Sequence, residues 1–366
     1  MVMIGTAILA SASFLHAAEN SKDTSIAVEA LSRLQNIDLD ANPGVKAAVT
    51  KVLDQVRGTP QFVQIVRQFK IKGQAPELLE VAIKNSTNST GAEAMQIVLS
   101  EGSEDSVKAA LAGTNNIAVV QALGGTGRSE AAKFLLPIIT DASRSVALRR
   151  ESVRALAKSK DGATDILELA RNNKLLADLQ LLAASELNNA AWPEIKTEAA
   201  RDLPLPKAAG AEALPSIAEL VHRTGDPARG AEIFKREAVG CNKCHQVKGE
   251  GVDFGPNLSE IGTKLGKEAI YESILDPSAG IAFGFEGWQL ELSNGEEVSG
   301  LLVSETADEI AMKAVGGIVT RYKKSDVTRR TQQNVSLMPS GLQQAMTTQE
   351  FVDLVEYLAS LKHNQN

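Results

Sequence analysis

Apolar positions between residues 23 and 205 recur at the three- and four-residue spacing of amphipathic helices, with almost none of the alternation typical of strands. Three segments end in similar apolar pairs, and their last leucines, Leu123, Leu156 and Leu187, are separated by 33 and 31 residues. Each segment is followed by a break and by a second helical stretch, at residues 130–139, 163–170 and 192–200. A period of this length made of two helices indicates an α-solenoid, in which successive helix pairs stack.

One of these stretches, Leu148 to Ala157 with the sequence LRRESVRALA, resembles the first helix of a HEAT-like repeat. We therefore expect residues 23–205 to form a HEAT-like α-solenoid, and an irregular all-α domain is the alternative. The stretch that follows is rich in proline, alanine and glycine, which predicts a linker at residues 206–214. A second domain is expected at residues 215–363.

The second domain begins and ends with predicted helices. Asp226 followed by Pro227 is a favourable helix start, since aspartate caps the first turn and proline suits its first position. Thr347 and Glu350 form a capping-box sequence in front of the last amphipathic segment. We expect the first and last helices of this domain to cross closely at Gly230, because glycine has no side chain to hold the backbones apart.

Alternating hydrophobicity interrupts the helical pattern at about residues 284–330. An Asn294-Gly295 turn and a Gly316-Gly317 turn each separate two strand-like segments. The pattern predicts a small antiparallel β-module of four or five strands inserted in the second domain. A structural cap, a cover for a functional site and a partner-recognition surface are its possible roles.

Composition and charge limit the function classes. The 366 residues are 43% hydrophobic and 23% charged, as in a soluble globular protein, and the net charge of −7 gives no general nucleic-acid footprint. The apolar residues 1–18 read as a secretory signal peptide, although the usual basic start is missing. An uncleaved membrane anchor and a buried first helix are the alternatives.

The two cysteines of the chain, Cys241 and Cys244, stand three positions apart and are followed at once by His245. This C-x-x-C-H pattern is typical of c-type haem attachment, because two thiols on one turn can each bond a vinyl group and the adjacent imidazole can then bind the iron. A redox disulfide would need a βαβ setting, and a zinc site would need a second pair of ligands nearby. The sequence offers neither, so haem is favoured.

Two further residues complete the predicted haem site. The backbone carbonyl of Pro256 is expected to fix His245 through its Nδ1–H group. Met338, which is followed by a proline, is expected to be the sixth iron ligand through its thioether sulfur. The weaker candidates for this position are Met346, Met312, His222 and His363.

Residues 225–361 as a whole resemble a haem-binding, cytochrome c-like domain of planctomycete and verrucomicrobial proteins. The matching residues are Gly225-Asp226, Arg229-Gly230, Phe234, Cys241-x-x-Cys244-His245, Gly255-Pro256-Asn257-Leu258, Ile274–Ser278, Asn294-Gly295, Gly300, Met338-Pro339, Gly341-Leu342 and Asp353-Leu354. The resemblance implies a class I cytochrome c-like helical domain, which in that family often follows helical repeats. It also implies electron transfer beside a sugar or alcohol dehydrogenase.

The sequence thus predicts a mainly α-helical monohaem c-type cytochrome with one covalent haem c, no catalytic residues and an extracytoplasmic or periplasmic location. It would carry electrons between a dehydrogenase and a respiratory acceptor. A haem enzyme or gas sensor with an open distal site is one alternative, and a helical scaffold with an auxiliary haem is another. From Ser216 onward, 15 basic and 21 acidic residues give a charge of −6, which would steer the domain towards basic partners. A local basic rim near the haem edge is also conceivable from four lysines, Lys243, Lys248, Lys264 and Lys267.

Overall fold

The structure is a computed structural model, and it describes residues 25–34, 37–205 and 214–363. The predicted signal peptide at residues 1–18 and nearly all of the predicted linker at 206–214 lie outside the described residues. Within the described ranges, no helix has the length and apolar character needed to span a bilayer.

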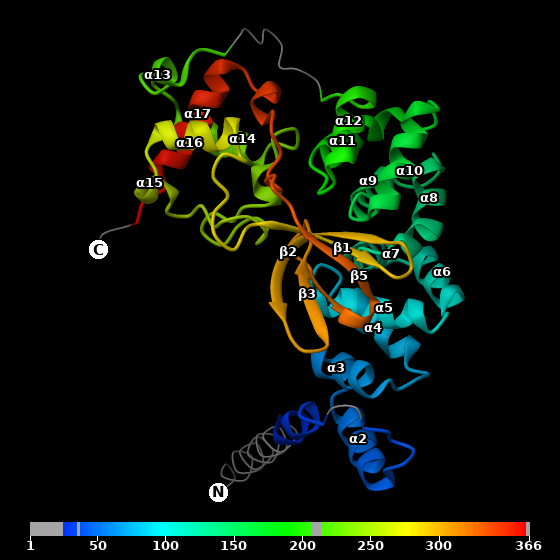
Figure 1. Cartoon of the computed structure of the whole chain (residues 1–366). Helices are drawn as coiled ribbons and strands as arrows, with labels where there is room; N and C mark the ends of the chain where they lie inside the picture. The colour runs from blue at the N-terminus through cyan, green and yellow to red at the C-terminus, as the bar shows by residue number, and fades with distance from the viewer. Residues whose placement is uncertain (1–24, 35–36, 206–213, 364–366) are drawn as a thin grey trace, which may run out of the picture.

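The first half of the chain consists of helices joined by short turns (Figure 1). Their bounds are α2 Pro43–Gln55, α3 Pro60–Phe69, α4 Ala75–Lys84, α5 Ser89–Ser100, α6 Glu104–Ala112, α7 Asn116–Gly125, η1 Ser129–Ala131, α8 Ala132–Thr140, α9 Val146–Leu156, α10 Lys160–Arg171, α11 Ala177–Asn188 and α12 Pro193–Asp202. Side-chain caps fix several starts, because Thr59, Asn88, Ser145 and Ser159 each accept a hydrogen bond from a backbone N–H of the first turn.

These helices stack in two rows. Helices α3, α5, α7, α9 and α11 contact one another in succession, and α8, α10 and α12 form part of the second row. Leu123, Leu156 and Leu187, the residues with the repeated spacing, lie on α7, α9 and α11 of the first row, and all three are buried. The three leucines with the repeated spacing therefore lie on successive helices of one stacked row.

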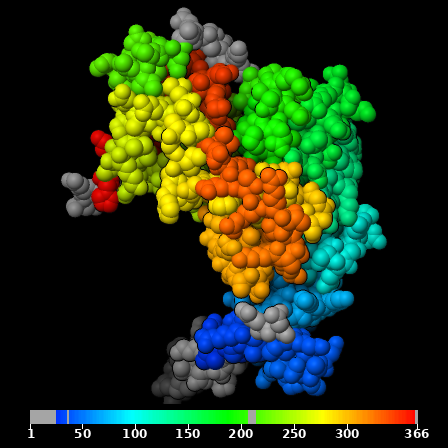
Figure 2. Space-filling view, in the orientation of Figure 1, coloured from blue at the N-terminus to red at the C-terminus, as the bar shows by residue number. Residues whose placement is uncertain are grey.

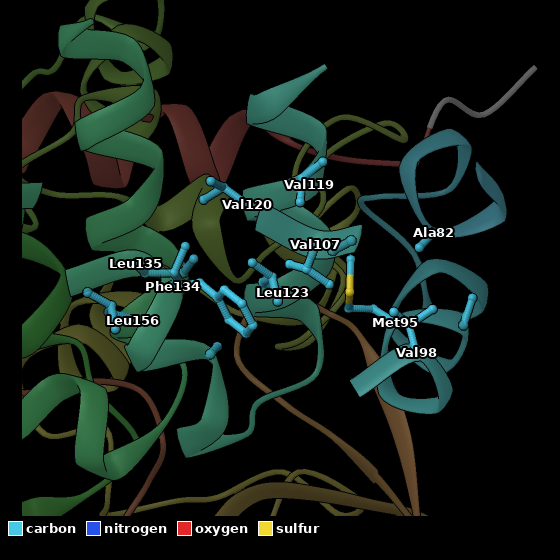
Figure 3. Packing of buried hydrophobic residues seen from close by; sticks show 14 of the residues in the cluster. Ala82, Met95, Val98, Val107, Val119, Val120, Leu123, Phe134, Leu135 and Leu156 are labelled. Atoms are coloured by element: carbon cyan, nitrogen blue, oxygen red, sulfur yellow. The ribbon is translucent and has the colours of Figure 1, made fainter. Parts of the chain in front are cut away.

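One hydrophobic core runs through the array. Figure 3 shows buried side chains of successive helices in contact, from Met95 on α5 through Leu123 on α7 to Leu156 on α9. Because each helix buries its apolar stripe against its neighbours, the array is a continuous body rather than a string of separate units.

The predicted β-module is a five-stranded antiparallel sheet in the order β4-β3-β2-β1-β5. The strands are β1 Gly287–Leu292, β2 Glu297–Glu305, β3 Glu309–Lys313, β4 Val319–Lys323 and β5 Val327–Gln332. The sheet extends slightly beyond the predicted end at residue 330. Gly295, with φ 87°, closes the β1–β2 hairpin, and Gly316 and Gly317, with φ 100° and 79°, close the β3–β4 hairpin, so both predicted turns are present.

The remaining helices form the C-terminal domain. They are α13 Ile217–Leu220, α14 Pro227–Lys235, η2 Cys241–Lys243, α15 Ile261–Lys264, α16 Lys267–Leu275, η4 Leu342–Ala345 and α17 Thr348–Ser360. One further 3-10 turn, η3 Lys324–Asp326, connects strands β4 and β5 of the inserted sheet. Helices α14 and α17 cross at Gly230, where an added Cβ would lie 2.1 Å from the backbone oxygen of Asp353. One turn further on, the rings of Phe234 and Tyr357 meet edge to face at 5.7 Å between centroids. The close crossing predicted at this glycine is confirmed.

The sheet joins the two helical parts. Figure 2 shows it in orange, in contact with the C-terminal domain and with the array. The sheet carboxylates Glu296, Glu297 and Glu309 form ion pairs with Arg128, Lys160 and Arg67 of the array. The sheet is therefore bound to several helices of the array, which fixes the C-terminal domain against the array.

Candidate functional site

The Cys241–His245 segment is a tight turn after helix α14. Gly240 adopts φ 62°, a left-handed conformation that favours glycine, and the 3-10 turn η2 then begins at Cys241. Both cysteines are free, and burial raises the pKa of Cys241 to about 12 and that of Cys244 to about 11. At neutral pH both groups are therefore protonated thiols.

His245 is oriented by its backbone surroundings. Its Nδ1 lies 2.7 Å from the carbonyl oxygen of Pro256, which only accepts hydrogen bonds, so Nδ1 carries the proton of this bond. The lone pair of Nε2 is then free to bind a metal. Burial lowers the pKa of His245, and this effect is larger than the opposite effect of the hydrogen bond to Pro256. The net lowering of the pKa favours the neutral ring.

Glycine at position 255 makes this arrangement possible. A Cβ added to Gly255 would lie 2.6 Å from Cε1 and 2.9 Å from Nδ1 of His245. The backbone thus packs directly against the imidazole, and the contact with Pro256 follows from that approach.

A cavity of about 920 Å³ opens beside this turn. Its lining includes Cys241, Cys244, His245, Pro256 and Met338, which are all the site residues that the sequence predicts. The volume falls in the upper part of the range of roughly 300–1,000 Å³ for sites of small molecules and cofactors. The lining is largely apolar, as an iron porphyrin requires, and the donors present are two thiols, an imidazole and a thioether. The residues therefore fit a covalently attached haem.

Met338 is held by a chain of hydrogen bonds. Its backbone N–H donates to the Ser336 hydroxyl at 3.1 Å, and the Ser336 N–H donates to the Ser278 hydroxyl at 3.1 Å. Among the described methionines and histidines, only Met338 and His245 line the cavity. Met346 and Met312 are buried in hydrophobic packing and do not line the cavity, and His363 is 2.7 Å from Glu260. The ligand roles of His245 and Met338 stay predictions.

The cavity has walls from all three parts of the molecule. Helices α9 and α11 of the array contribute Arg154 and Glu186, Trp192 precedes helix α12, and strand β2 contributes Ser299 and Leu301. Sequence reasoning missed this contribution of the array to the cavity. No local motif marks these residues, because they reach the cavity only through the docking of distant segments.

The expected basic rim requires a correction at two lysines. The ammonium group of Lys243 is 3.0 Å from Glu186 and donates to Ser185 at 3.0 Å, and that of Lys267 is 2.6 Å from Glu356. Lys243 therefore lies in the interface with the array, and the charge of Lys267 is neutralised by an ion pair within the C-terminal domain. Lys248 and Lys264 remain exposed, and of these two Lys264 lines the cavity.

Comparison with known proteins agrees with this geometry. A family model described as Cytochrome c matches residues 227–295, from the start of α14 to the β1–β2 turn. The matched segment includes Cys241, Cys244, His245 and Pro256 and ends before Met338. No curated protein matches the chain. The chain thus carries a cytochrome c-like haem-binding domain, whose family binds haem c covalently, and electron transfer is the function consistent with it.

Proposed function

We propose that this protein is a monohaem c-type cytochrome that carries single electrons. In this proposal Cys241 and Cys244 would hold the haem by thioether bonds, and His245 and Met338 would bind its iron. The observation that carries the proposal is the shared cavity, which is lined by both thiols, the imidazole and the thioether of these four residues. When bound, haem supplies reversible one-electron exchange between ferric and ferrous iron.

The residues of the chain prepare this chemistry. Pro256 keeps the proton of His245 on Nδ1, so that Nε2 presents its lone pair. The bonds from Met338 to Ser336 and from Ser336 to Ser278 restrict the segment that carries the thioether. The surrounding lining is largely apolar, and a thioether ligand raises the reduction potential.

We further propose that the helical array is a HEAT-like α-solenoid and that the protein works outside the cytoplasm. The stacked rows of α7, α9 and α11 support the first statement, and the thioether chemistry of the cytochrome c family supports the second. By resemblance, the electron donor is a sugar or alcohol dehydrogenase and the acceptor is a respiratory component.

Intact mass and a pyridine haemochrome spectrum test the central proposal, after expression together with a haem-maturation system. The mass is expected to exceed that of the polypeptide by one haem, because addition of a thiol across a vinyl double bond loses no atom. The reduced protein is expected to show sharp α and β bands of a low-spin iron. The mass of the bare polypeptide would refute haem attachment, whereas a high-spin spectrum with carbon monoxide binding would indicate an open distal site.

A further inference from the structure

The cavity wall that the helical array contributes contains a buried donor with no partner. Trp192 is 3% exposed and lines the cavity, and its indole Nε1 forms no hydrogen bond with the described residues. Leaving a buried N–H group without an acceptor is energetically costly. A fold that retains such a donor at a cofactor cavity therefore indicates an acceptor that the protein chain itself does not supply.

A cation lies in the same wall. Lys158, in the turn that follows α9, also lines the cavity, and in the described part of the chain its ammonium group forms no ion pair or hydrogen bond. Burial lowers the pKa of Lys158 and outweighs the opposing effect of Glu151 and Glu186. Lys158 is half-buried in a largely apolar wall, where an ammonium group gains from an anionic partner.

The carboxylates near Lys158 are already engaged. Glu151 is 3.2 Å from Arg154, and Glu186 is 3.0 Å from Lys243. The third carboxylate of this interface, Glu237, is 2.6 Å from Arg150 and 3.0 Å from Arg154. All three acids are thus paired with other cations, and none of them forms an ion pair with Lys158 in the described part of the chain.

We infer that Lys158 and Trp192 form an anion-binding subsite of the cavity, and that its ligand is a carboxylate. The ammonium group provides the charge, and the indole N–H provides a directed hydrogen bond. Two sources carry this chemistry, namely a propionate of the attached cofactor and a free small carboxylate. The inference depends on the proposed function only if the ligand is a propionate of the cofactor.

NMR of the reduced holoprotein tests the subsite, because the chain has two tryptophans and thus two indole N–H signals. Trp192→Phe assigns the signal, and Trp288, which stacks near Arg330 at 4.8 Å, provides the internal reference. Spectra and midpoint potentials are recorded for the wild type and for Lys158→Gln, with acetate added at constant ionic strength. Lys174→Gln, which removes an exposed lysine of the array, is the charge control.

If a cofactor propionate is the ligand, Lys158→Gln shifts the Trp192 signal and lowers the potential without acetate, and acetate has no effect. If a free carboxylate is the ligand, acetate shifts only the Trp192 signal and lowers the wild-type potential to a plateau. Lys158→Gln then weakens acetate binding about tenfold, as the loss of one charge-assisted hydrogen bond predicts. Trp192→Phe weakens acetate binding as well, as measured by the midpoint potential. This second variant keeps the test valid if Lys158→Gln does not fold.

One outcome overturns the inference. Both residues also line a smaller cavity of about 20 Å³, which is large enough for one water. If that water satisfies the indole, the Trp192 signal is the same in the wild type and in Lys158→Gln at every acetate concentration, and Lys158→Gln changes the potential no more than Lys174→Gln. A wild-type protein without covalent haem would instead refute the proposed function, and the acetate titration of Trp192 would still test the subsite.

Discussion

The ammonium group of Lys243 is 3.0 Å from the carboxylate of Glu186 on helix α11. In the sequence, Lys243 stands between the two cysteines of the haem-attachment segment. Its ammonium group also donates to the Ser185 hydroxyl at 3.0 Å, and that hydroxyl donates to the backbone oxygen of Glu237 at 2.9 Å. The helical array therefore contacts the segment on both sides of Cys241, at Glu237 and at Lys243. In this arrangement the array is part of the site's support.

The pair of Lys243 and Glu186 is expected to stabilise the fold measurably, because its side chains are only 27% and 18% exposed. A double-mutant cycle with Lys243→Met and Glu186→Gln should give a coupling energy of about 0.5–3 kcal/mol. The measurement is guanidinium unfolding of the holoprotein. The exposed pair of Lys108 and Asp105 serves as control and should give a coupling near zero. Equal coupling in the two cycles would show that Lys243 does not anchor the array.

The contact between the sheet and the array is expected to depend on pH through Glu296, whose side chain is 11% exposed. Burial by itself would raise the pKa of Glu296, but bonds from Ser129 and Asn294 and the charge of Arg128 prevail and lower it. The folded state thus binds this proton more weakly than the unfolded state. The stability that Glu296 supplies is complete above the unfolded pKa of about 4.3 and is lost as the pH falls through the lower folded value.

Thermal unfolding measured between about pH 3 and pH 6 tests this dependence, since that range spans the unfolded pKa. Glu296→Gln is expected to lower the melting temperature most at pH 6 and to flatten the profile towards acid. Glu80→Gln removes an exposed carboxylate of the array and is the control. A profile of Glu296→Gln that runs parallel to the wild type would contradict the assignment.

The crossing of α14 and α17 gives a test of packing. Gly230→Ala would place a methyl group 2.1 Å from the oxygen of Asp353, so the helices must move apart, at a cost of about 1–3 kcal/mol of unfolding free energy. Gly44→Ala in α2 is the matched control, since nothing lies within 4 Å of its Cβ and alanine favours a helix by up to about 1 kcal/mol. Denaturant unfolding curves compare the two variants, and similar stabilities would refute the close crossing.

These particulars also show what the sequence can and cannot predict. The period of Leu123 and Leu156 predicts neighbouring helices because stacked repeats bury equivalent positions. The crossing at Gly230 and the contact between His245 and Pro256 are predictable for a similar reason, since each follows from a local pattern that only a few residues can satisfy.

The face that the array turns towards the sheet and the C-terminal domain is not predictable in this way. Arg150 and Glu237 are 87 positions apart, and Arg67 and Glu309 are separated by 242 positions. Charged residues of this kind occur all along the chain, so nothing in the sequence distinguishes the pairs that form. The same reason explains why Lys243 was expected at an open rim and lies in an interface.

The proposed ligand role of Met338 leads to the last prediction. Met338→Ala removes the thioether from the cavity, so the iron is expected to lose its sixth ligand. The spectrum should change from low-spin to high-spin, the reduced protein should bind carbon monoxide, and the potential should fall, because a thioether ligand raises it. Met346→Leu replaces a core methionine outside the cavity and should leave all three properties unchanged. If Met338→Ala keeps a low-spin spectrum while Met346→Leu loses it, Met346 is the ligand and the cavity must rearrange when haem binds.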